Sequence, residues 1–153
     1  DSETYNVLIE SFLRKGLPAE AKYTSDKMME IGHLPTASTF RSVIDGLYSD
    51  GRFQTASRVM KCMLEKDIKE NFDLIPNILE TLLDRGHVEE VIDRLELMFV
   101  KGCAPDLNKL SNGLCEKGKS FTACQLLQFA LQKNCNIKAA TYDTVLNGLC
   151  ADG

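Results

Sequence analysis

Apolar residues recur along the chain with the spacing of one face of an α-helix. The first set, Tyr5, Leu8, Ile9 and Phe12, stands at i, i+3, i+4 and i+7, which fits a period of 3.6 residues. No stretch alternates with the period of two that marks a β-strand. The pattern therefore predicts an all-α chain. The same face returns at Phe40, Val43, Ile44 and Leu47, at Ile75, Ile78, Leu79 and Leu82, and at Tyr142, Val145, Leu146 and Leu149.

The helical pattern repeats at an interval of 35 residues. The pair Thr4-Tyr5 opens the first set, and Thr39-Phe40 opens the second one 35 residues later. A glycine follows each set at the same interval. A fixed period of this length is typical of repeat architectures, in which each unit stacks on its neighbours. The glycines in question are Gly16, Gly51 and Gly86.

One repeat is shorter than the others. The next glycine of the series is Gly118 instead of residue 121, so three residues are missing. Sequence matching places the loss between Asp106 and Gly113. We therefore expect a single solenoid segment over residues 1–153, with repeats at 2–36, 37–71, 72–106 and 107–138 and a half-repeat at 139–153.

Each repeat also contains a second apolar helix after its glycine. Glycine ends a helix easily because it tolerates a left-handed backbone. Pro18 suits the first turn of a second helix, and Pro35 and Pro105 keep successive repeats apart. A single hairpin cannot bury its apolar face, so we expect a right-handed α-solenoid of stacked antiparallel helix–turn–helix repeats. The second-helix residues predicted to be buried are Ala21, Met28, Ala56, Val59, Met60, Met63, Val91, Leu95, Met98, Ala123, Leu126, Leu127 and Ala130.

Composition adds limits to this picture. The chain is 44% hydrophobic and 26% charged, values of a folded protein. No apolar run approaches the ~20 residues of a membrane span, so no membrane partner is expected. The repeat pattern is already under way at the first residue and is interrupted at the last. We therefore expect a piece of a longer array, in which a targeting peptide would lie elsewhere.

Six cysteines and two histidines are the residues most often found in metal sites. No two cysteines have the spacing of a zinc knuckle, and Cys115 and Cys150 occupy the same place in two repeats. We expect both to be buried as small apolar residues, and unpaired thiols suit a reducing compartment. His33 and His87 are predicted to lie on the surface.

An acidic run on the second helix of the third repeat suggests two interpretations. Carboxylates at i, i+3 and i+4 spacing could hold a divalent cation of a nuclease. Alternatively, the run is a solvated helix face in which Glu90 and Asp93 lie near Arg94. No nucleophile accompanies the run, so we expect no enzyme, no metal, no cofactor and no small-molecule substrate. The run consists of Glu89, Glu90, Asp93 and Glu96.

The repeat phrases together resemble pentatricopeptide repeat (PPR) proteins. The shared marks are the 35-residue period, TYN with two aliphatics after it, GLC before a turn glycine, and the closing KGCAPD of residues 101–106. The resemblance is greatest to the type with uniform repeats, the P-class. It implies binding of single-stranded RNA with one nucleotide per repeat. It also implies an organellar location, in a mitochondrion or chloroplast, and a role in RNA processing.

The resemblance assigns roles to particular residues. The residue after the aromatic and the last residue of the repeat read the base, while the residue two before the aromatic packs on it. Pro76 has no hydrogen-bonding side chain, so the third repeat is expected to be blind to sequence, and the missing residues leave the fourth without an assigned pair. The base-reading candidates are Asn6 with Thr36, Arg41 with Asn71, Pro76 with Asp106, and Asp143. The base-packing candidates are Glu3, Ser38, Asp73 and Ala140.

Charge bears on affinity for phosphate. The family position that faces the RNA backbone is basic only at Arg14; the other repeats have Ser49, Asp84, Glu116 and Ala151 there. The net charge is −4, and residues 72–106 carry eight carboxylates against three basic side chains. An acidic chain is a poor electrostatic match for nucleic acid.

Two functions therefore stay open. The resemblance favours a single-stranded RNA-binding segment, with weak binding by these repeats alone. The scarcity of cations and the unusual reading residues favour a protein-docking or structural scaffold, for example in an organellar ribosome or processing complex.

Overall fold

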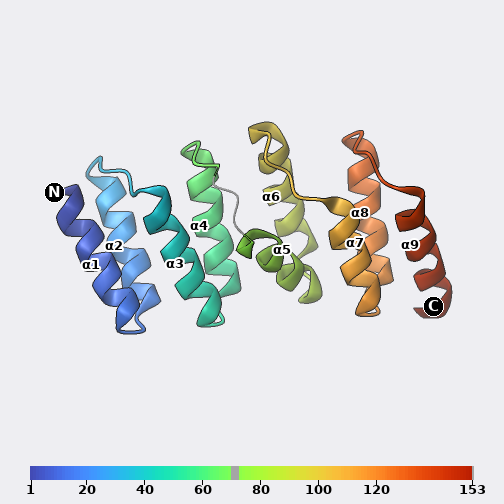
Figure 1. The fold of residues 1–153 in the computed structure, drawn as a ribbon, viewed down its shortest axis with the longest axis horizontal. Helices are drawn as coiled ribbons and strands as arrows, with labels where there is room; N and C mark the ends of the chain where they lie inside the picture. The colour runs from blue at the N-terminus through green and yellow to red at the C-terminus, as the bar shows by residue number, and fades with distance from the viewer. Residues whose placement is uncertain (70–72, 153) are drawn as a thin grey trace. The chain divides into compact units, whose positions relative to one another are not determined.

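The computed structural model of the chain describes residues 1–69 and 73–152 (Figure 1). Every regular element in these two ranges is an α-helix, as the sequence predicts. None of the described helices is both long and apolar enough to cross a membrane. The helices are α1 (Ser2–Arg14), α2 (Pro18–Glu30), α3 (Ala37–Ser49), α4 (Phe53–Glu65), α5 (Leu74–Asp84), α6 (Val88–Lys101), α7 (Leu107–Glu116), α8 (Ser120–Gln132) and α9 (Ala139–Asp152).

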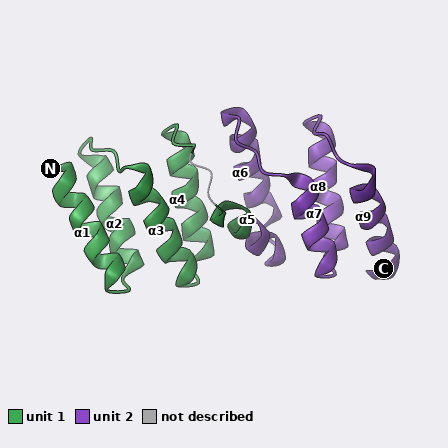
Figure 2. Ribbon diagram, viewed as in Figure 1, with its two compact units in different colours: residues 1–78 green, residues 79–153 purple. Residues whose placement is uncertain are grey.

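The helices form two compact units, residues 1–78 and 79–153 (Figure 2). In the first unit α1 packs on α2 and α3, and α3 packs on α4. In the second unit α7 packs on α8 and α9, and α8 also contacts α6 and α9. Each unit thus consists of helical hairpins lying side by side, which confirms the predicted all-α repeat fold.

The core follows the predicted stripes. All the second-helix residues named above are buried, and Phe40 and Leu47 of α3 have no exposed surface. The outer stripes differ, because Leu8 on α1 is 44% exposed and Leu146 on α9 is 59% exposed. The prediction that these two leucines are buried is wrong, since α1 and α9 each contact described helices on one side only.

A glycine in the left-handed region ends each complete first helix. At Gly16 φ is 73°, and the amide of Leu17 donates to the carbonyl of Phe12 over 2.9 Å. This bond closes the last turn of α1 as in a Schellman motif. Second helices end on left-handed residues too, which sequence inspection did not predict. The glycines after the first helices are Gly16, Gly51, Gly86 and Gly118, and the residues after the second are Gly32, Asp67, Gly102 and Asn134.

Helix α7 is shorter than the other complete first helices of similar sequence. It has 10 residues, whereas α1 and α3 each have 13. The difference of three equals the number of residues missing from the repeat spacing. The exact repeat boundaries stay a proposal.

The cysteines are less buried than predicted. Cys115 is half-buried and Cys150 is exposed, so the prediction that both lie in the core is wrong. Cys115 on α7 faces α9, since its Sγ would lie 3.7 Å from a Cβ added at Gly148, whereas no described helix follows α9 to cover Cys150. Cys62 on α4 lies 3.7 Å from the sulfur of Met29 on α2, and burial raises the pKa of its thiol.

The acidic run on α6 surrounds an arginine. Arg94 is 5% exposed and donates to Glu90 over 3.2 Å and to Asp93. Within the described residues, no group of three or more His, Cys, Asp or Glu side chains is placed to hold a metal ion. The two histidines are half-buried and not fully on the surface, and His33 bonds to the Ser2 hydroxyl over 2.9 Å.

Candidate nucleic-acid interface

The base-reading candidates lie near the start of the first helices. Asn6 is in α1, Arg41 in α3, Pro76 in α5 and Asp143 in α9. The base-packing candidates Glu3, Ser38, Asp73 and Ala140 are all exposed. Thr36 and Asp106 are the N-cap residues of α3 and α7. Asn71 lies outside the described residues.

One predicted pair is brought together through a third residue. The Thr39 hydroxyl donates to Oδ1 of Asn6 over 2.9 Å and lies 3.0 Å from the Thr36 hydroxyl. Thr36 Oγ1 also accepts the Thr39 amide, 3.1 Å away, which caps α3. Nδ2 of Asn6 has no hydrogen bond to another residue that the structure describes. Asn6 therefore keeps one donor group for a ligand.

Sequence analysis missed an equivalent residue in the short repeat, Asn108. It lies ten residues before Gly118, as Asn6 lies ten before Gly16. Thr141 donates to its Oδ1 over 2.9 Å, across the same 33 residues that separate Asn6 from Thr39. Counting back from the turn glycine, instead of forward from the start of the repeat, would have found it.

The side chain of Asn108 is fully engaged inside the protein. Its Oδ1 accepts the Lys138 amide over 2.9 Å as well as the Thr141 hydroxyl. Its Nδ2 donates to Asp106 over 3.2 Å and to the Asn136 carbonyl over 3.3 Å. A base could bond to Asn108 only by displacing one of these partners.

Asp106 is the N-cap residue of α7, as Thr36 is of α3. Its Oδ1 accepts the Asn108 amide over 2.9 Å and so caps α7. The pairing of Asp106 with Pro76 in base reading stays a prediction. Pro76 itself is half-buried in the first turn of α5.

Carboxylate side chains lie near Arg14, the residue predicted to contact phosphate. Arg14 is exposed, and its Nη2 donates to the Ser11 hydroxyl over 3.2 Å. It shares a groove between α1 and α3 with Glu10 and Asp45. Both carboxylates are exposed and would oppose an approaching phosphate.

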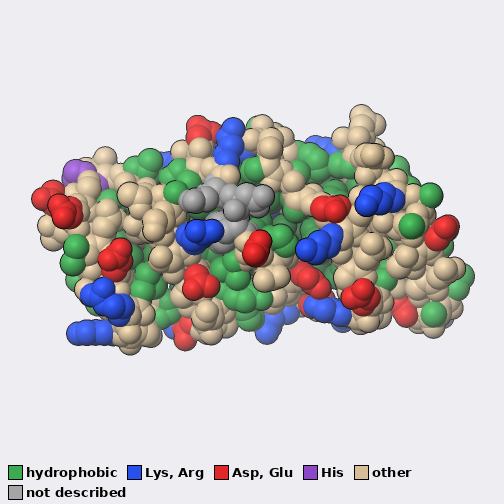
Figure 3. Space-filling view, in the orientation of Figure 1, with side chains coloured by type: hydrophobic (Ala, Val, Ile, Leu, Met, Phe, Trp, Pro, Cys, Tyr) green, Lys and Arg blue, Asp and Glu red, His purple; other side chains and the backbone are tan. Residues whose placement is uncertain are grey.

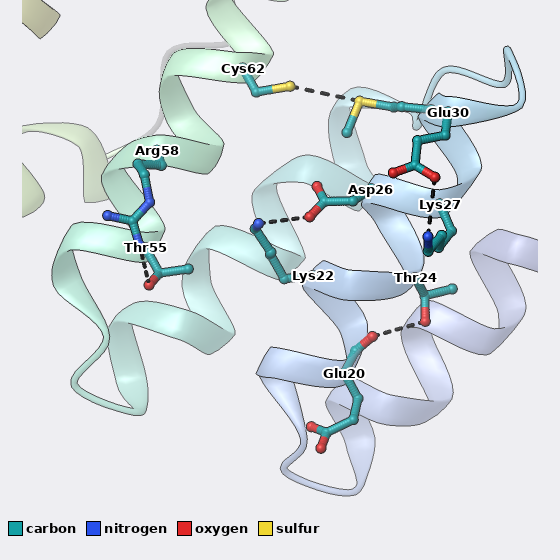
Figure 4. Close-up of polar contacts among 10 residues, drawn as sticks. Glu20, Lys22, Thr24, Asp26, Lys27, Glu30, Thr55, Arg58 and Cys62 are labelled. Carbon is teal, nitrogen blue, oxygen red and sulfur yellow. Dashed lines mark hydrogen bonds and ion pairs between the residues drawn. The ribbon is translucent and has the colours of Figure 1, made fainter.

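Basic side chains on the second helices are engaged locally. Figure 4 shows Lys22 paired with Asp26 at 2.7 Å and Lys27 with Glu30 at 3.2 Å, both along α2. On α4, Arg58 donates to the Thr55 hydroxyl over 3.1 Å. On the face shown in Figure 3 acidic and basic side chains are interspersed, and the described basic side chains of that face form no continuous band.

A lysine neutralises part of the acid in the second unit. Nζ of Lys117 lies 2.9 Å from Oε1 of Glu80 and 2.8 Å from Oδ2 of Asp84. Hydrogen bonds to Asp84 and Glu80 raise the pKa of Lys117. Asp84, which sequence analysis counted as an unfavourable phosphate position, is therefore already paired.

Comparison with known proteins agrees with this architecture. The PPR repeat family model matches residues 3–33 and 38–68. Large ribosomal subunit protein mL102 (rPPR5) of Arabidopsis thaliana is 47% identical over 145 residues, which are 94% of this chain and 19% of that protein. The chain belongs to the pentatricopeptide repeat family. Its subtype within that family stays a prediction.

Other PPR relatives are less similar in sequence to this chain. Small ribosomal subunit protein mL103 (rPPR7) of Arabidopsis thaliana is 26% identical over 98% of this chain and 37% of its own length. A chloroplastic PPR protein of the same plant is 32% identical over 58% of this chain and 12% of its own length. The chain therefore spans well under half the length of each of these relatives.

A solved structure shows the same fold. The crystal structure of the PPR protein PPR10 from maize superposes with a TM-score of 0.51 at 24% identity, over 97% of this chain and 22% of that one. The PPR chain is therefore an all-α helical-repeat solenoid.

Proposed function

We propose that this chain is a docking segment of an organellar PPR protein, which holds a partner inside a ribosomal subunit without reading RNA base by base. The name of the 47% identical relative, a large ribosomal subunit protein, supports the setting. The proposed location is a mitochondrion or chloroplast, which agrees with a relative named as chloroplastic. The role is binding and not catalysis, as is general for helical-repeat proteins of this family.

The hydrogen bonds of Asn108 are the observation that carries this proposal. By its distance from the turn glycine Asn108 corresponds to Asn6, the base-reading candidate of the first repeat, yet every polar group of its side chain has an intramolecular partner. Replacing one of these bonds by a bond to a base gains little, because one hydrogen bond is exchanged for another. With Pro76 in the third repeat, two consecutive repeats have no side chain ready to select a base.

A second candidate function is base reading by the first repeat alone. Nδ2 of Asn6 is available, and Thr36 lies at the other end of the same hydrogen-bond network. Arg14 is the basic residue placed for the backbone. One such repeat, with Glu3 as its base-packing residue, would bind RNA weakly and with a slight preference for pyrimidine.

Titration of the chain with single-stranded homopolymer RNA at several salt concentrations tests the proposal. Each neutralised phosphate contributes about −0.7 to the slope of log K against log salt. With Arg14 as the main contact and Arg41 as a second one, the slope should be shallower than about −2, and binding should be high micromolar or weaker. Tight, steeply salt-dependent and base-selective binding would overturn the docking proposal.

Charge reversal sharpens this experiment. Asp73→Lys on the exposed approach to α5 should strengthen RNA binding if RNA follows the first helices. Glu89→Lys on α6 is the matched control, with the same charge change on a second helix. Asp84→Lys is less informative, because Lys117 lies 2.8 Å away and a second cation there would break its ion pair.

Cosedimentation tests docking directly. The chain should cosediment with organellar large ribosomal subunits in a sucrose gradient, and Asn6→Ala with Thr36→Ala should leave the bound fraction unchanged. Loss of the bound fraction in this double variant would favour base reading by the first repeat.

A further inference from the structure

A groove opens between the first helices of the first unit. It has a volume of about 420 Å³ and is lined by Glu10, Leu13, Arg14, Ser42, Asp45 and Gly46. Leu13 is the apolar side chain of the lining, and it lies beside Gly46, where an added Cβ would be 2.8 Å from Cδ2 of Leu13. The groove thus combines one apolar side chain with three charged ones.

The two carboxylates of the groove are unpaired. Neither Glu10 nor Asp45 has an ion pair with another residue in the part of the chain that the structure describes. Arg14, on the same helix as Glu10, donates to Ser11 instead. The lining therefore carries two carboxylates against one guanidinium, a net charge of −1 that favours a cationic ligand.

In the second unit a lysine binds at the position equivalent to Glu10. Glu80 lies 70 residues after Glu10, in the equivalent place two repeats later, and Gly113 is the counterpart of Gly46. There the ammonium group of Lys117 contacts Glu80 at 2.9 Å and Asp84 at 2.8 Å. The chain itself thus places a lysine against the carboxylate at this position.

The first unit lacks such a lysine of its own. The residue at the place of Lys117, directly before the turn glycine, is Asp50. Its carboxylate accepts a hydrogen bond from Arg52 over 2.8 Å and does not enter the groove's residue set. The position that Lys117 fills in one unit is therefore open in the other.

We propose that the groove between α1 and α3 binds a lysine or arginine side chain from a Lys/Arg-rich polypeptide segment of a partner protein. The methylene groups of that side chain lie over Leu13 and Gly46, and its charge lies between Glu10 and Asp45. A phosphate is disfavoured, because two carboxylates outnumber the Arg14 guanidinium in the lining. This inference rests on the proposed docking function and names the chemistry of its partner.

A peptide titration tests the groove. The probe is a 12-residue fluorescent peptide of alternating Lys and Ser, titrated with the 153-residue chain. Glu10→Gln with Asp45→Asn should weaken binding about three- to tenfold, as expected for the loss of two exposed ion pairs. The control, Glu20→Gln with Glu65→Gln, makes the same change in net charge on α2 and α4 and should alter affinity less than twofold.

A second variant places a lysine of the chain itself against the groove. Arg14→Asp with Asp50→Lys recreates the arrangement of Asp84, Lys117 and Glu80 in the first unit and leaves the net charge unchanged. Peptide affinity should fall by a similar factor, while the circular dichroism spectrum stays that of the parent chain. Unchanged affinity in this variant would overturn the inference, because the groove would then not be the binding place.

The outcomes separate this inference from the docking proposal. If the control loses as much affinity as the groove variant, binding is nonspecific and the groove assignment fails, whatever the cosedimentation result. If the groove variants lose peptide binding but the chain does not cosediment with ribosomal subunits, the groove assignment stands and the ribosomal docking role fails. Homopolymer RNA provides a further check. If RNA displaces the peptide, and if RNA also binds the groove variant more tightly than the parent chain, the groove assignment is overturned.

Discussion

The Thr39 hydroxyl donates a hydrogen bond to the side-chain oxygen of Asn6 over 2.9 Å, and this bond ties α3 to α1. Its counterpart from Thr141 to Asn108 ties α9 to α7 at the same spacing. The position to which the PPR resemblance assigns base reading is therefore also a link between neighbouring repeats in this chain.

Loss of this link should weaken the first unit. Thr39 is 6% exposed, and Thr39→Val keeps its shape but removes the donor. We expect the free energy of unfolding to fall by roughly 1 kcal/mol. Urea denaturation measures the change. Thr4→Val, at an exposed threonine of α1, is the control and should change stability little; equal losses in the two variants would contradict a role of the hydrogen bond.

Truncation of the aromatic residues of the first helices should have unequal effects. Phe40 has no exposed surface, whereas Tyr5 and Tyr142 are half-buried. Phe40→Ala should cost ~3–5 kcal/mol, and the two tyrosine variants clearly less. Denaturant melts of the three variants give the comparison. Equal losses would mean that the helices do not stack as the structure shows.

The short helix α7 should open before α3. The side chains of Ser111 and Asn112 each bury a polar atom without a hydrogen-bond partner in the described structure, which weakens local packing. Amides in residues 107–112 should exchange faster than those in residues 43–47. Hydrogen exchange followed by mass spectrometry measures both stretches. Uniform protection would argue against a weak point at the short repeat.

A close contact between α8 and α9 should make one glycine irreplaceable. A Cβ added at Gly148 would lie 2.1 Å from Oγ of Ser120. Gly148→Ala should cost ~1–3 kcal/mol through overpacking, in spite of the better helix propensity of alanine. Adding Ser120→Ala should recover part of the loss in thermal melts. No recovery in the double variant would show that the contact is not the cause.

Gly46 provides the comparison for that experiment. There the added Cβ would meet the end of the flexible Leu13 side chain at 2.8 Å. Gly46→Ala should therefore cost less than Gly148→Ala.

The ion pairs of Lys117 should contribute to stability until the lysine deprotonates. Hydrogen bonds to Asp84 and Glu80 raise its pKa above the ordinary 10.5, so the folded state favours the charged form. The contribution is complete below pH 10.5 and is lost as the pH rises further. The stability difference between the parent and Lys117→Met, measured in urea, should be constant from neutral pH to that pH and then shrink. Because the lysine is half-exposed, the difference should be smaller than that for Thr39→Val and should decrease in high salt.

The sequence alone determined the helices and hairpins of this protein through its local periodicity. The apolar spacing around Phe40 and the 35-residue interval between turn glycines follow from which residues a helix places on one face and where it can end. These are short-range effects, so helices, hairpins and the burial of the second-helix stripes could be predicted. The pairing of Asn6 with Thr36 came instead from the resemblance to PPR proteins.

Tertiary structure decided the rest. The hydrogen bonds of Asn108 and the pairing of Lys117 with Glu80 depend on groups brought together from different repeats. The exposure of Cys150 likewise depends on which helices pack against α9. Such contacts follow from the distance and direction between neighbouring helices, which a one-dimensional pattern does not contain. Glu10 and Glu80, for example, are the same residue type at equivalent repeat positions, so the sequence does not distinguish them. In the folded chain Glu10 lines a groove, whereas Glu80 forms an ion pair with Lys117.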